Sequence, residues 1–178
     1  MLKDIERVMF QEKEIEKRVL ELAERISQDY AGKELLLVGV LKGSVVFTAD
    51  LLKRIQIPCE IDFIAVSTYG NSTETSGVVK ILKDLDHSVE GKHVIIVEDI
   101  VDTGITLKYL LNYFKSKNAE SVEIITLLSK EARRATDVKV KYIGFNIPDE
   151  FIVGYGLDYA EKYRNLPYIG VLKESVYR

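Results

Sequence analysis

Three carboxylates and a Thr-Gly turn directly follow an apolar run near the middle of the chain. The segment VIIVEDIVDTGIT covers residues 94–106 and contains Glu98, Asp99 and Asp102. An apolar run without alternation predicts a strand buried on both faces, so the acids should emerge at its carboxyl end. There Glu98 and Asp99 could accept hydrogen bonds from ribose hydroxyls or help to hold a divalent cation. Asp102, at the lip of the turn, could act as a general base.

The turn after these acids has the features of a phosphate site. A Thr-Gly turn that leads into a helix offers backbone N–H groups and the positive end of the helix dipole. The hydroxyls of Thr103 and Thr106 add two donors. An alternative is helix capping, since an acid directly before a helix is a common N-cap. Three acids at one strand end, followed by Thr-Gly-x-Thr, favour the binding site.

Strands and helices alternate along the chain. Apolar patterns predict helices over 11–30, 45–55 and 106–117, and strands over 34–40, 59–70, 78–85, 93–99, 121–130 and 141–148. This order predicts an α/β fold with a parallel, doubly wound sheet, in which ligands bind beyond the carboxyl ends of the strands. The polar stretch NSTETSG at 71–77 predicts either a hairpin loop or an active-site lid.

Composition limits the partners of the protein. The chain has 178 residues, of which 47% are hydrophobic and 30% charged, and this predicts one globular domain. A net charge of -3 lacks the basic excess of a general nucleic-acid binder. The single cysteine excludes an internal disulfide framework, and the two histidines show no metal-ligand spacing. A charged N-terminal segment and the lack of a long apolar run predict a cytoplasmic protein without a membrane partner.

The segment VIIVEDIVDTGIT resembles the phosphoribosyl-diphosphate signature of the type I phosphoribosyltransferases. The segments LKGS, STYG, LLSK and IPDEFIVGYGLDYAEKYRNLPYIG are similar to those of the bacterial hypoxanthine-guanine phosphoribosyltransferases, over almost the whole chain. The resemblance implies the type I phosphoribosyltransferase fold: a mostly parallel, doubly wound sheet flanked by helices, with a small hood built from N- and C-terminal segments. It implies a single domain over 1–178, with residues 146–178 in the hood, and a homodimer or homotetramer.

The resemblance also implies a role for individual residues at the ribose-phosphate end. Residues 102–106 match the loop that holds the 5'-phosphate: Asp102, Thr103, Gly104, Ile105 and Thr106. Glu98 and Asp99 match the acids that hold the ribose hydroxyls and a Mg²⁺ ion, and Asp102 matches the general base. Lys42 and Gly43 match the diphosphate loop, with a cis peptide expected between Leu41 and Lys42. Arg164 matches the arginine that meets the diphosphate.

At the purine end the resemblance implies another set. Lys130 matches the lysine that donates to the 6-oxo group, Phe151 the ring that stacks on the base, and Ile152 the residue whose backbone meets its edge. Asp158 matches a purine-site carboxylate near Mg²⁺. A mobile loop over about 68–78, including Thr68 and Tyr69, would close over the substrates.

These parts predict Mg²⁺-dependent transfer of the 5-phosphoribosyl group from phosphoribosyl diphosphate to N9 of hypoxanthine or guanine, giving IMP or GMP. Without the resemblance, LKGS is an ordinary turn; Lys130, Asp158 and Arg164 are surface charges; and Phe151 and Ile152 are core residues of a short strand. Two other functions stay open. One is a phosphoribosyltransferase with xanthine or a pyrimidine as acceptor. The other is an RNA-binding regulator with the same signature, which the acidic net charge opposes.

Overall fold

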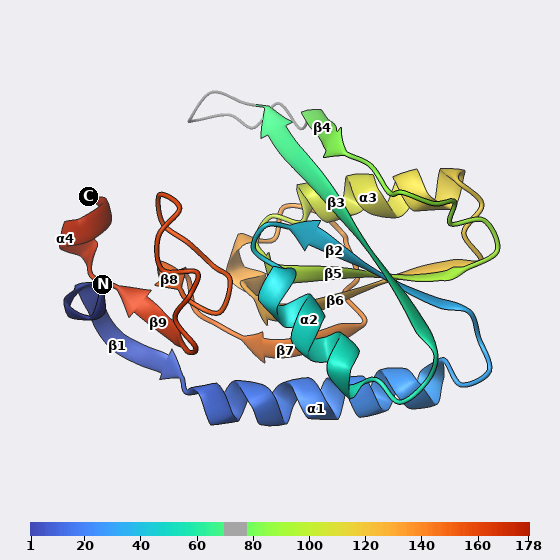
Figure 1. The fold of residues 1–178 in the computed structure, drawn as a ribbon. Coiled ribbons are helices and arrows are strands. Elements are labelled where there is room, and N and C mark those ends of the chain that lie inside the picture. Colours follow the sequence, from blue (N-terminus) through green and yellow to red (C-terminus); the bar gives the residue numbers. More distant parts are fainter. Residues whose placement is uncertain (70–77) are drawn as a thin grey trace.

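The computed structural model describes residues 1–69 and 78–178, which form two sheets and the helices around them (Figure 1). The larger sheet has six strands in the order β4-β3-β2-β5-β6-β7. Its members are β2 (Leu35–Leu41), β3 (Cys59–Tyr69), β4 (Val78–Lys83), β5 (His93–Val101), β6 (Ser121–Ser129) and β7 (Tyr142–Asn146). The stretch 71–77 and most of the predicted mobile loop lie outside the described residues.

β5 lies in the middle of this sheet and confirms the predicted buried strand. It pairs with β2 on one side and β6 on the other, both in parallel. Its residues Val94, Ile95, Ile96 and Val97 are all fully buried. Because layers cover both faces of such a strand, its sequence has no polar alternation.

Helices cover both faces of the larger sheet, as a doubly wound fold requires. α1 (Glu12–Asp29) and α2 (Val45–Arg54) share one core with Leu35 and Leu37 of β2. α3 (Ile105–Ser116) shares a second core with Leu36 and Val38 of the same strand. Successive β2 side chains therefore point into opposite layers, and Figure 1 shows the two helical layers on either side of the sheet. The predicted α/β class is confirmed.

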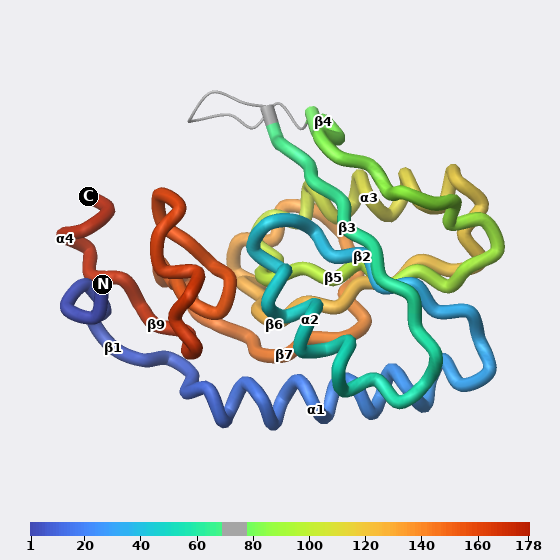
Figure 2. Tube along the Cα trace, viewed as in Figure 1, coloured from blue at the N-terminus to red at the C-terminus, as the bar shows by residue number. Residues whose placement is uncertain are grey.

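The smaller sheet joins segments that are far apart in the sequence. It has three antiparallel strands in the order β1-β9-β8. They are β1 (Ile5–Phe10), β8 (Ile152–Val153) and β9 (Ile169–Leu172), accompanied by the short helices η1 (Leu2–Asp4) and α4 (Glu174–Tyr177). A third short helix, η2 (Glu131–Arg133), follows β6 of the larger sheet. In the trace of Figure 2, β1, just before α1, runs beside β9 near the other end of the chain. This is the small hood that the resemblance implies.

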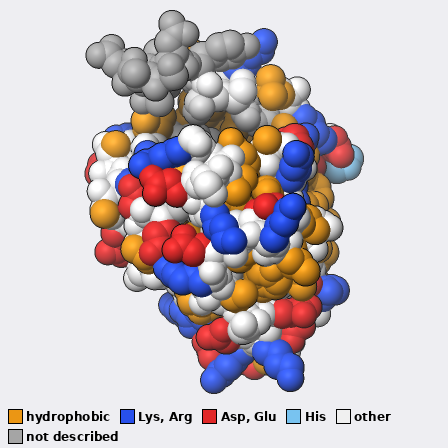
Figure 3. All heavy atoms as spheres, turned by 90° about the vertical axis from the view of Figure 1, so that its left-hand side faces the viewer, with side chains coloured by type: hydrophobic (Ala, Val, Ile, Leu, Met, Phe, Trp, Pro, Cys, Tyr) orange, Lys and Arg blue, Asp and Glu red, His pale blue; other side chains and the backbone are white. Residues whose placement is uncertain are grey.

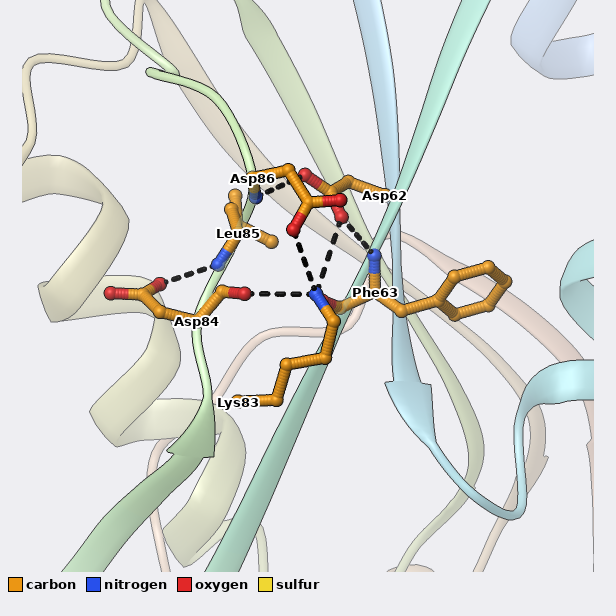
Figure 4. Close-up of polar contacts among 6 residues, drawn as sticks. All are labelled: Asp62, Phe63, Lys83, Asp84, Leu85 and Asp86. Carbon is orange, nitrogen blue, oxygen red and sulfur yellow. Dashed lines mark hydrogen bonds and ion pairs between the residues drawn. The ribbon is translucent and has the colours of Figure 1, made fainter.

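Both outer strands of the larger sheet are held by side chains. On β7, the guanidinium of Arg18 from α1 donates to the carbonyl oxygens of Ile143 and Gly144, each at 2.8 Å. At the other edge β4 runs antiparallel to β3. The ammonium of Lys83 donates there to the Phe63 carbonyl at 3.0 Å and lies near the Asp62 carboxylate (Figure 4). These contacts hold the two outer strands, β7 and β4, in place at the edges of the larger sheet.

The structure differs from the prediction at β5 and at β1. β5 continues through the acids to Val101, because its pairing with β6 extends as far as Ser129. β1 was not predicted at all: its sequence IERVMF has two charged residues in six, and its partner lies near the other end of the chain. Within the described ranges, no helix is both long and apolar enough to span a membrane.

Candidate active site

The loop between β5 and α3 forms a hollow at the carboxyl edge of the larger sheet. The hollow has a volume of about 170 Å³, and its walls include Glu98, Asp102 and the 103–107 segment. Gly104 is the N-cap of α3 and has a left-handed φ of 84°, a conformation that suits glycine. No acid caps the helix, so the capping alternative is wrong. The N–H groups of the first helical turn face the hollow without intrahelical partners, as at any helix start.

Glu98 and Asp99 lie side by side where β5 reaches this edge. Burial raises the pKa of Glu98 well above its ordinary value, and the charge of Asp99 raises it further. Burial also raises the pKa of Asp99, although the nearby Arg164 acts in the opposite direction. Asp99 accepts a hydrogen bond from the N–H of Ile100 at 2.7 Å. The two carboxyls have thus lost water that ligand hydroxyls or a cation could replace.

Asp102, directly after β5, is paired with Arg133. Among the described residues, its Oδ1 atom is buried and accepts no hydrogen bond. The Nε atom of Arg133 lies 2.8 Å from this oxygen, in an ion pair without hydrogen-bond geometry. Arg133 was missed in the sequence, although its place three residues after Lys130 at the end of the same strand was a usable signal.

The turn after β2 is packed directly against the acids of β5. The peptide bond between Leu41 and Lys42 is cis, as the resemblance implies. A Cβ atom on Gly43 would lie 1.7 Å from Oδ2 of Asp99, and a Cβ on Gly156 would lie 2.2 Å from the Gly43 carbonyl oxygen. Only glycine fits at these two positions. The LKGS turn is therefore held between β5 and the C-terminal segment.

Charged side chains of the C-terminal segment surround this turn. The ammonium of Lys42 lies 3.0 Å from Oε2 of Glu161. The guanidinium of Arg164 contacts Asp158 at 2.9 Å, Glu161 at 3.2 Å and the carbonyl oxygen of Gly156 at 2.8 Å. In Figure 3 acidic and basic side chains adjoin one another on the face that carries the smaller sheet. Asp158 and Arg164 are therefore paired groups and not isolated surface charges.

Lys130 lies at the end of β6, and its alternative interpretation as a solvated side chain is wrong. Lys130 is only 9% exposed. Its Nζ atom contacts Oδ1 of Asp149 at 3.2 Å, and Nη1 of Arg133 lies 3.4 Å from the same oxygen. The hydrogen bond from Lys130 lowers the pKa of Asp149. Asp102, Arg133, Asp149 and Lys130 thus form one chain of alternating charges.

Phe151 and Ile152 differ in exposure. Ile152 is buried in β8, as a core residue would be, whereas Phe151 is 36% exposed, so the core interpretation of Phe151 is wrong. The ring of Tyr177 stacks on Phe151 with centroids 4.6 Å apart, and Tyr159 meets it edge-on at 5.5 Å. The aromatic group is thus supported from the C-terminal side.

Two predicted loop residues lie at the border of the described chain. Thr68 is exposed near the end of β3, and Tyr69 is the last residue of that strand. The segment that follows them lies outside the described residues, so the closing loop stays a prediction.

A phosphate-sized hollow, acids at a strand end and a cationic turn are the parts of a transferase that handles a phosphorylated sugar. The chain belongs to the phosphoribosyl transferase domain family, whose sequence pattern matches residues 9–160. The chain is 54% identical over 177 residues to the hypoxanthine-guanine phosphoribosyltransferase of Bacillus subtilis strain 168, covering 99% of this chain and 98% of that protein.

Two further relatives agree with this. The bifunctional protein TilS/HprT of Listeria monocytogenes serotype 4b is 51% identical over 177 residues, which are 99% of this chain but only 27% of that protein. A crystal structure of a hypoxanthine phosphoribosyltransferase from Staphylococcus aureus superposes with a TM-score of 0.98 at 50% identity, covering 100% of this chain and 97% of that one.

Proposed function

We propose that this protein is a purine-salvage enzyme. It transfers the 5-phosphoribosyl group from phosphoribosyl diphosphate to N9 of hypoxanthine or guanine, giving IMP or GMP and diphosphate. The observation that carries the proposal is the convergence at one sheet edge of the hollow at the start of α3, the buried Lys130 and the carboxylate of Asp102. The named relatives at 54% and 50% identity support the same activity.

The ribose-phosphate end would hold the sugar of the substrate. Residues 102–106 line the hollow, and there the amides at the start of α3 and the hydroxyls of Thr103 and Thr106 would bind the 5'-phosphate. Glu98 and Asp99 would accept hydrogen bonds from the ribose hydroxyls. Ile105 would contribute only its backbone N–H, so its apolar side chain is compatible with phosphate.

The diphosphate would lie against the LKGS turn. Lys42 and Arg164 would supply the positive charge, and Gly43, which has no side chain, lets the turn pack directly against Asp99. The Nε atom of Arg164 is buried and donates to no oxygen of the described residues, so it remains a donor for an anion. Charge that develops on the leaving diphosphate would be stabilised by these preorganised groups.

The residues present fit a Mg²⁺ ion. The donors at this end are carboxylate oxygens of Glu98, Asp99 and Asp158. No cluster of three or more acidic, histidine or cysteine ligands occurs in the described part of the chain. Mg²⁺ is usually bound by one or two carboxylates together with substrate phosphates, so a site completed by the substrate is expected. When bound, the ion would neutralise charge on the diphosphate.

The purine end would set the acceptor. Phe151 would stack on the base, the backbone of Ile152 would meet its edge, and Asp158 would border it. Lys130 would donate to the 6-oxo group. Since an ammonium has donors only, it cannot accept from the 6-amino group of adenine.

In the proposed reaction one bond breaks, one bond forms and one proton is transferred. The bond from C1 of the ribose to the diphosphate oxygen breaks with its electron pair, and N9 of the purine attacks C1 from the opposite face. The N7 proton passes to the carboxylate of Asp102. We also place the enzyme in the cytoplasm, as the sequence features predict, and propose a homodimer or homotetramer on the resemblance alone.

The test is nucleotide formation with the purified protein, phosphoribosyl diphosphate, Mg²⁺ and one base at a time: hypoxanthine, guanine, xanthine, adenine or uracil. Product with hypoxanthine and guanine, and little with adenine or uracil, supports the proposal. If product forms only with xanthine or only with uracil, that base would be the acceptor in place of hypoxanthine and guanine. If no base gives product, the alternative of an RNA-binding regulator would be favoured. A measurement of RNA binding would then test that alternative.

The role of Asp102 has its own test. Asp102→Asn keeps the shape of the side chain and removes the base, so kcat should fall by about 10²- to 10⁴-fold, the usual contribution of general base catalysis. Binding of both substrates should be largely kept. Unchanged turnover would exclude Asp102 as the base.

A further inference from the structure

The carboxylate of Glu161 bridges the two cations assigned to the diphosphate. Its Oε2 atom lies 3.0 Å from Nζ of Lys42, and its Oε1 atom lies 3.2 Å from Nη2 of Arg164. The two cations come from segments far apart in the chain, and one side chain connects them. An anion with two separate oxygens is the type of ligand that this pair of cations accepts.

We propose that Glu161 is an internal competitor for the diphosphate subsite, a specificity-determining residue whose carboxylate occupies the substrate's cations until diphosphate displaces it. The inference rests on the proposed function, because it uses the assignment of Lys42 and Arg164 to diphosphate. It adds a residue that makes no attractive contact with the substrate and still sets the affinity for it.

The backbone around Glu161 forms a hydrogen-bonded turn that holds the residue in place. Ala160 and Glu161 have positive φ angles of 50° and 61°, a region that residues other than glycine seldom adopt. The segment from Tyr159 to Lys162 closes on itself through two backbone hydrogen bonds of 3.2 and 3.0 Å. The N–H of Glu161 also donates to Oδ2 of Asp158 at 2.9 Å. Since none of these contacts uses the side chain of Glu161, its carboxylate can leave the cations while the turn stays in place.

The exposure of the groups makes the exchange easy. The side chains of Lys42 and Glu161 are 66% and 65% exposed, so water replaces a broken contact at once. Exposed ion pairs stabilise a structure little. The pair between Arg164 and Asp158 is less exposed, at 25% and 27%, and would hold the guanidinium while Glu161 leaves. Asp158 thus keeps Arg164 in position, and Glu161 is the exchangeable partner.

An internal competitor changes which anions bind. A ligand must offer more negative charge, or better-spaced oxygens, than the carboxylate it replaces. Diphosphate meets this condition and inorganic phosphate meets it less well, so Glu161 acts as a repulsive element against the smaller anion. After the reaction the same carboxylate returns to Lys42 and Arg164, which favours release of the diphosphate product.

The experiment compares the unmodified protein with Glu161→Gln, which keeps the size of the side chain and removes its charge. Calorimetry would measure binding of diphosphate and of inorganic phosphate at a fixed Mg²⁺ concentration, and steady-state kinetics would measure KM for both substrates. We expect diphosphate to bind about two- to tenfold more tightly, the effect of losing two exposed pairs, with a parallel fall in KM for phosphoribosyl diphosphate. Inorganic phosphate should gain at least as much, and KM for the purine should not change.

Two controls make the result specific. Glu60→Gln removes a carboxylate from another exposed pair, with Lys92 at 2.7 Å, and should change none of these values. In a Lys42→Met background, adding Glu161→Gln should improve diphosphate binding less than it does alone, because one of the two cations is gone.

Equal or weaker diphosphate binding by Glu161→Gln would overturn the inference. Failure of the proposed function would be distinguishable from this, since in that case the unmodified protein itself would neither bind diphosphate nor form a nucleotide.

Discussion

The two ends of the candidate site contain the same kind of ion pair in different surroundings. At the purine end Lys130 contacts Asp149 at 3.2 Å, and the lysine side chain is 11% exposed. At the diphosphate end Lys42 contacts Glu161 at 3.0 Å, and the lysine side chain is 66% exposed. The distances are alike, so burial is the difference. A buried ammonium needs a replacement partner of matching chemistry, whereas an exposed one can exchange partners through water. Selectivity should therefore lie at the purine end and easy exchange at the diphosphate end.

The same comparison applies to the surroundings of each pair. The purine-end pair continues through Arg133 to Asp102, so the donor for the base and the acceptor for its proton share one charge network. The diphosphate-end pair continues to Arg164 and Asp158. Each end thus contains four linked charged groups, and the two lysines differ in burial while the networks are equal in size.

The largest expected effect is a loss of activity from a substitution at the diphosphate end. In Gly43→Ala the new Cβ atom would lie 1.7 Å from Oδ2 of Asp99, so the turn or the acid must move. Displacement of groups by about 1 Å can reduce turnover roughly 10²-fold, and we expect a loss of this size in kcat/KM for phosphoribosyl diphosphate. Steady-state kinetics would measure it. Gly32→Ala is the control, because its Cβ would meet nothing within 4 Å while its φ of +74° costs stability. Unchanged kinetics in Gly43→Ala would show that the turn can accommodate the added Cβ atom.

The next largest effect is a loss of base preference from a substitution at the purine end. Lys130→Met keeps the length and apolar stem of the side chain and removes the donor, so hypoxanthine loses the hydrogen bond to its 6-oxo group. The preference for hypoxanthine over adenine, measured as a ratio of kcat/KM values, should fall about 10- to 100-fold, the effect of one buried donor. The exposed Lys139, changed to Met, should leave the ratio as it is. An unchanged ratio in Lys130→Met would assign selectivity to the backbone around Ile152.

A smaller effect on KM is expected from the aromatic contact at the purine end. Tyr177 stacks on Phe151 and supports it for contact with the base. Tyr177→Ala should raise KM for hypoxanthine about two- to tenfold, because an aromatic pair contributes about 0.5–1.5 kcal/mol. KM for phosphoribosyl diphosphate should stay the same. Tyr177→Phe keeps the ring and is the matched control, and an equal rise in both variants would point to the hydroxyl instead.

The smallest effect concerns Glu98, which lies between the two ends. Burial raises its pKa in the folded protein, so the folded state binds a proton more readily than the unfolded state. The stability of the ligand-free protein should therefore fall as the pH rises from the ordinary pKa of a carboxyl to the raised one. Glu98→Gln removes this dependence. The Tm of the free protein at neutral pH should rise, by roughly 2–4 °C for each kcal/mol gained. The exposed Glu90, changed to Gln, should leave Tm and its pH dependence as they are, and a lower Tm in Glu98→Gln would contradict the prediction.

Local patterns were sufficient to predict the larger sheet. The apolar run at 94–97 and the helical spacing of Ile15, Val19 and Leu22 report burial directly, so these elements were predicted nearly to the residue. The strand, turn and helix start around the proposed phosphate loop were also readable, because they are contiguous in the sequence. Such signals need no knowledge of distant residues.

The smaller sheet and the charge pairs could not be predicted in this way. β1 forms because Ile5 lies opposite Leu172, and nothing in its own six residues requires a strand. The contact between Glu161 and Lys42, and that between Arg133 and Asp102, likewise depend on segments brought together by the fold. Lys130 would be a solvated side chain by its type, and only the packing around β6 buries it.

The pairing of β1 with β9 also sets an order in which the molecule can be completed during synthesis. β1 leaves the ribosome before every strand of the larger sheet, and its partner β9 leaves after all of them. The larger sheet can therefore begin to assemble while β1 still lacks its neighbour, and contacts so far apart in sequence form late. Tyr159, Glu161 and Arg164 lie between β8 and β9. A partly synthesised chain would therefore hold the phosphate loop before it holds the rest of the site, and catalysis would begin only once the two ends of the chain had met.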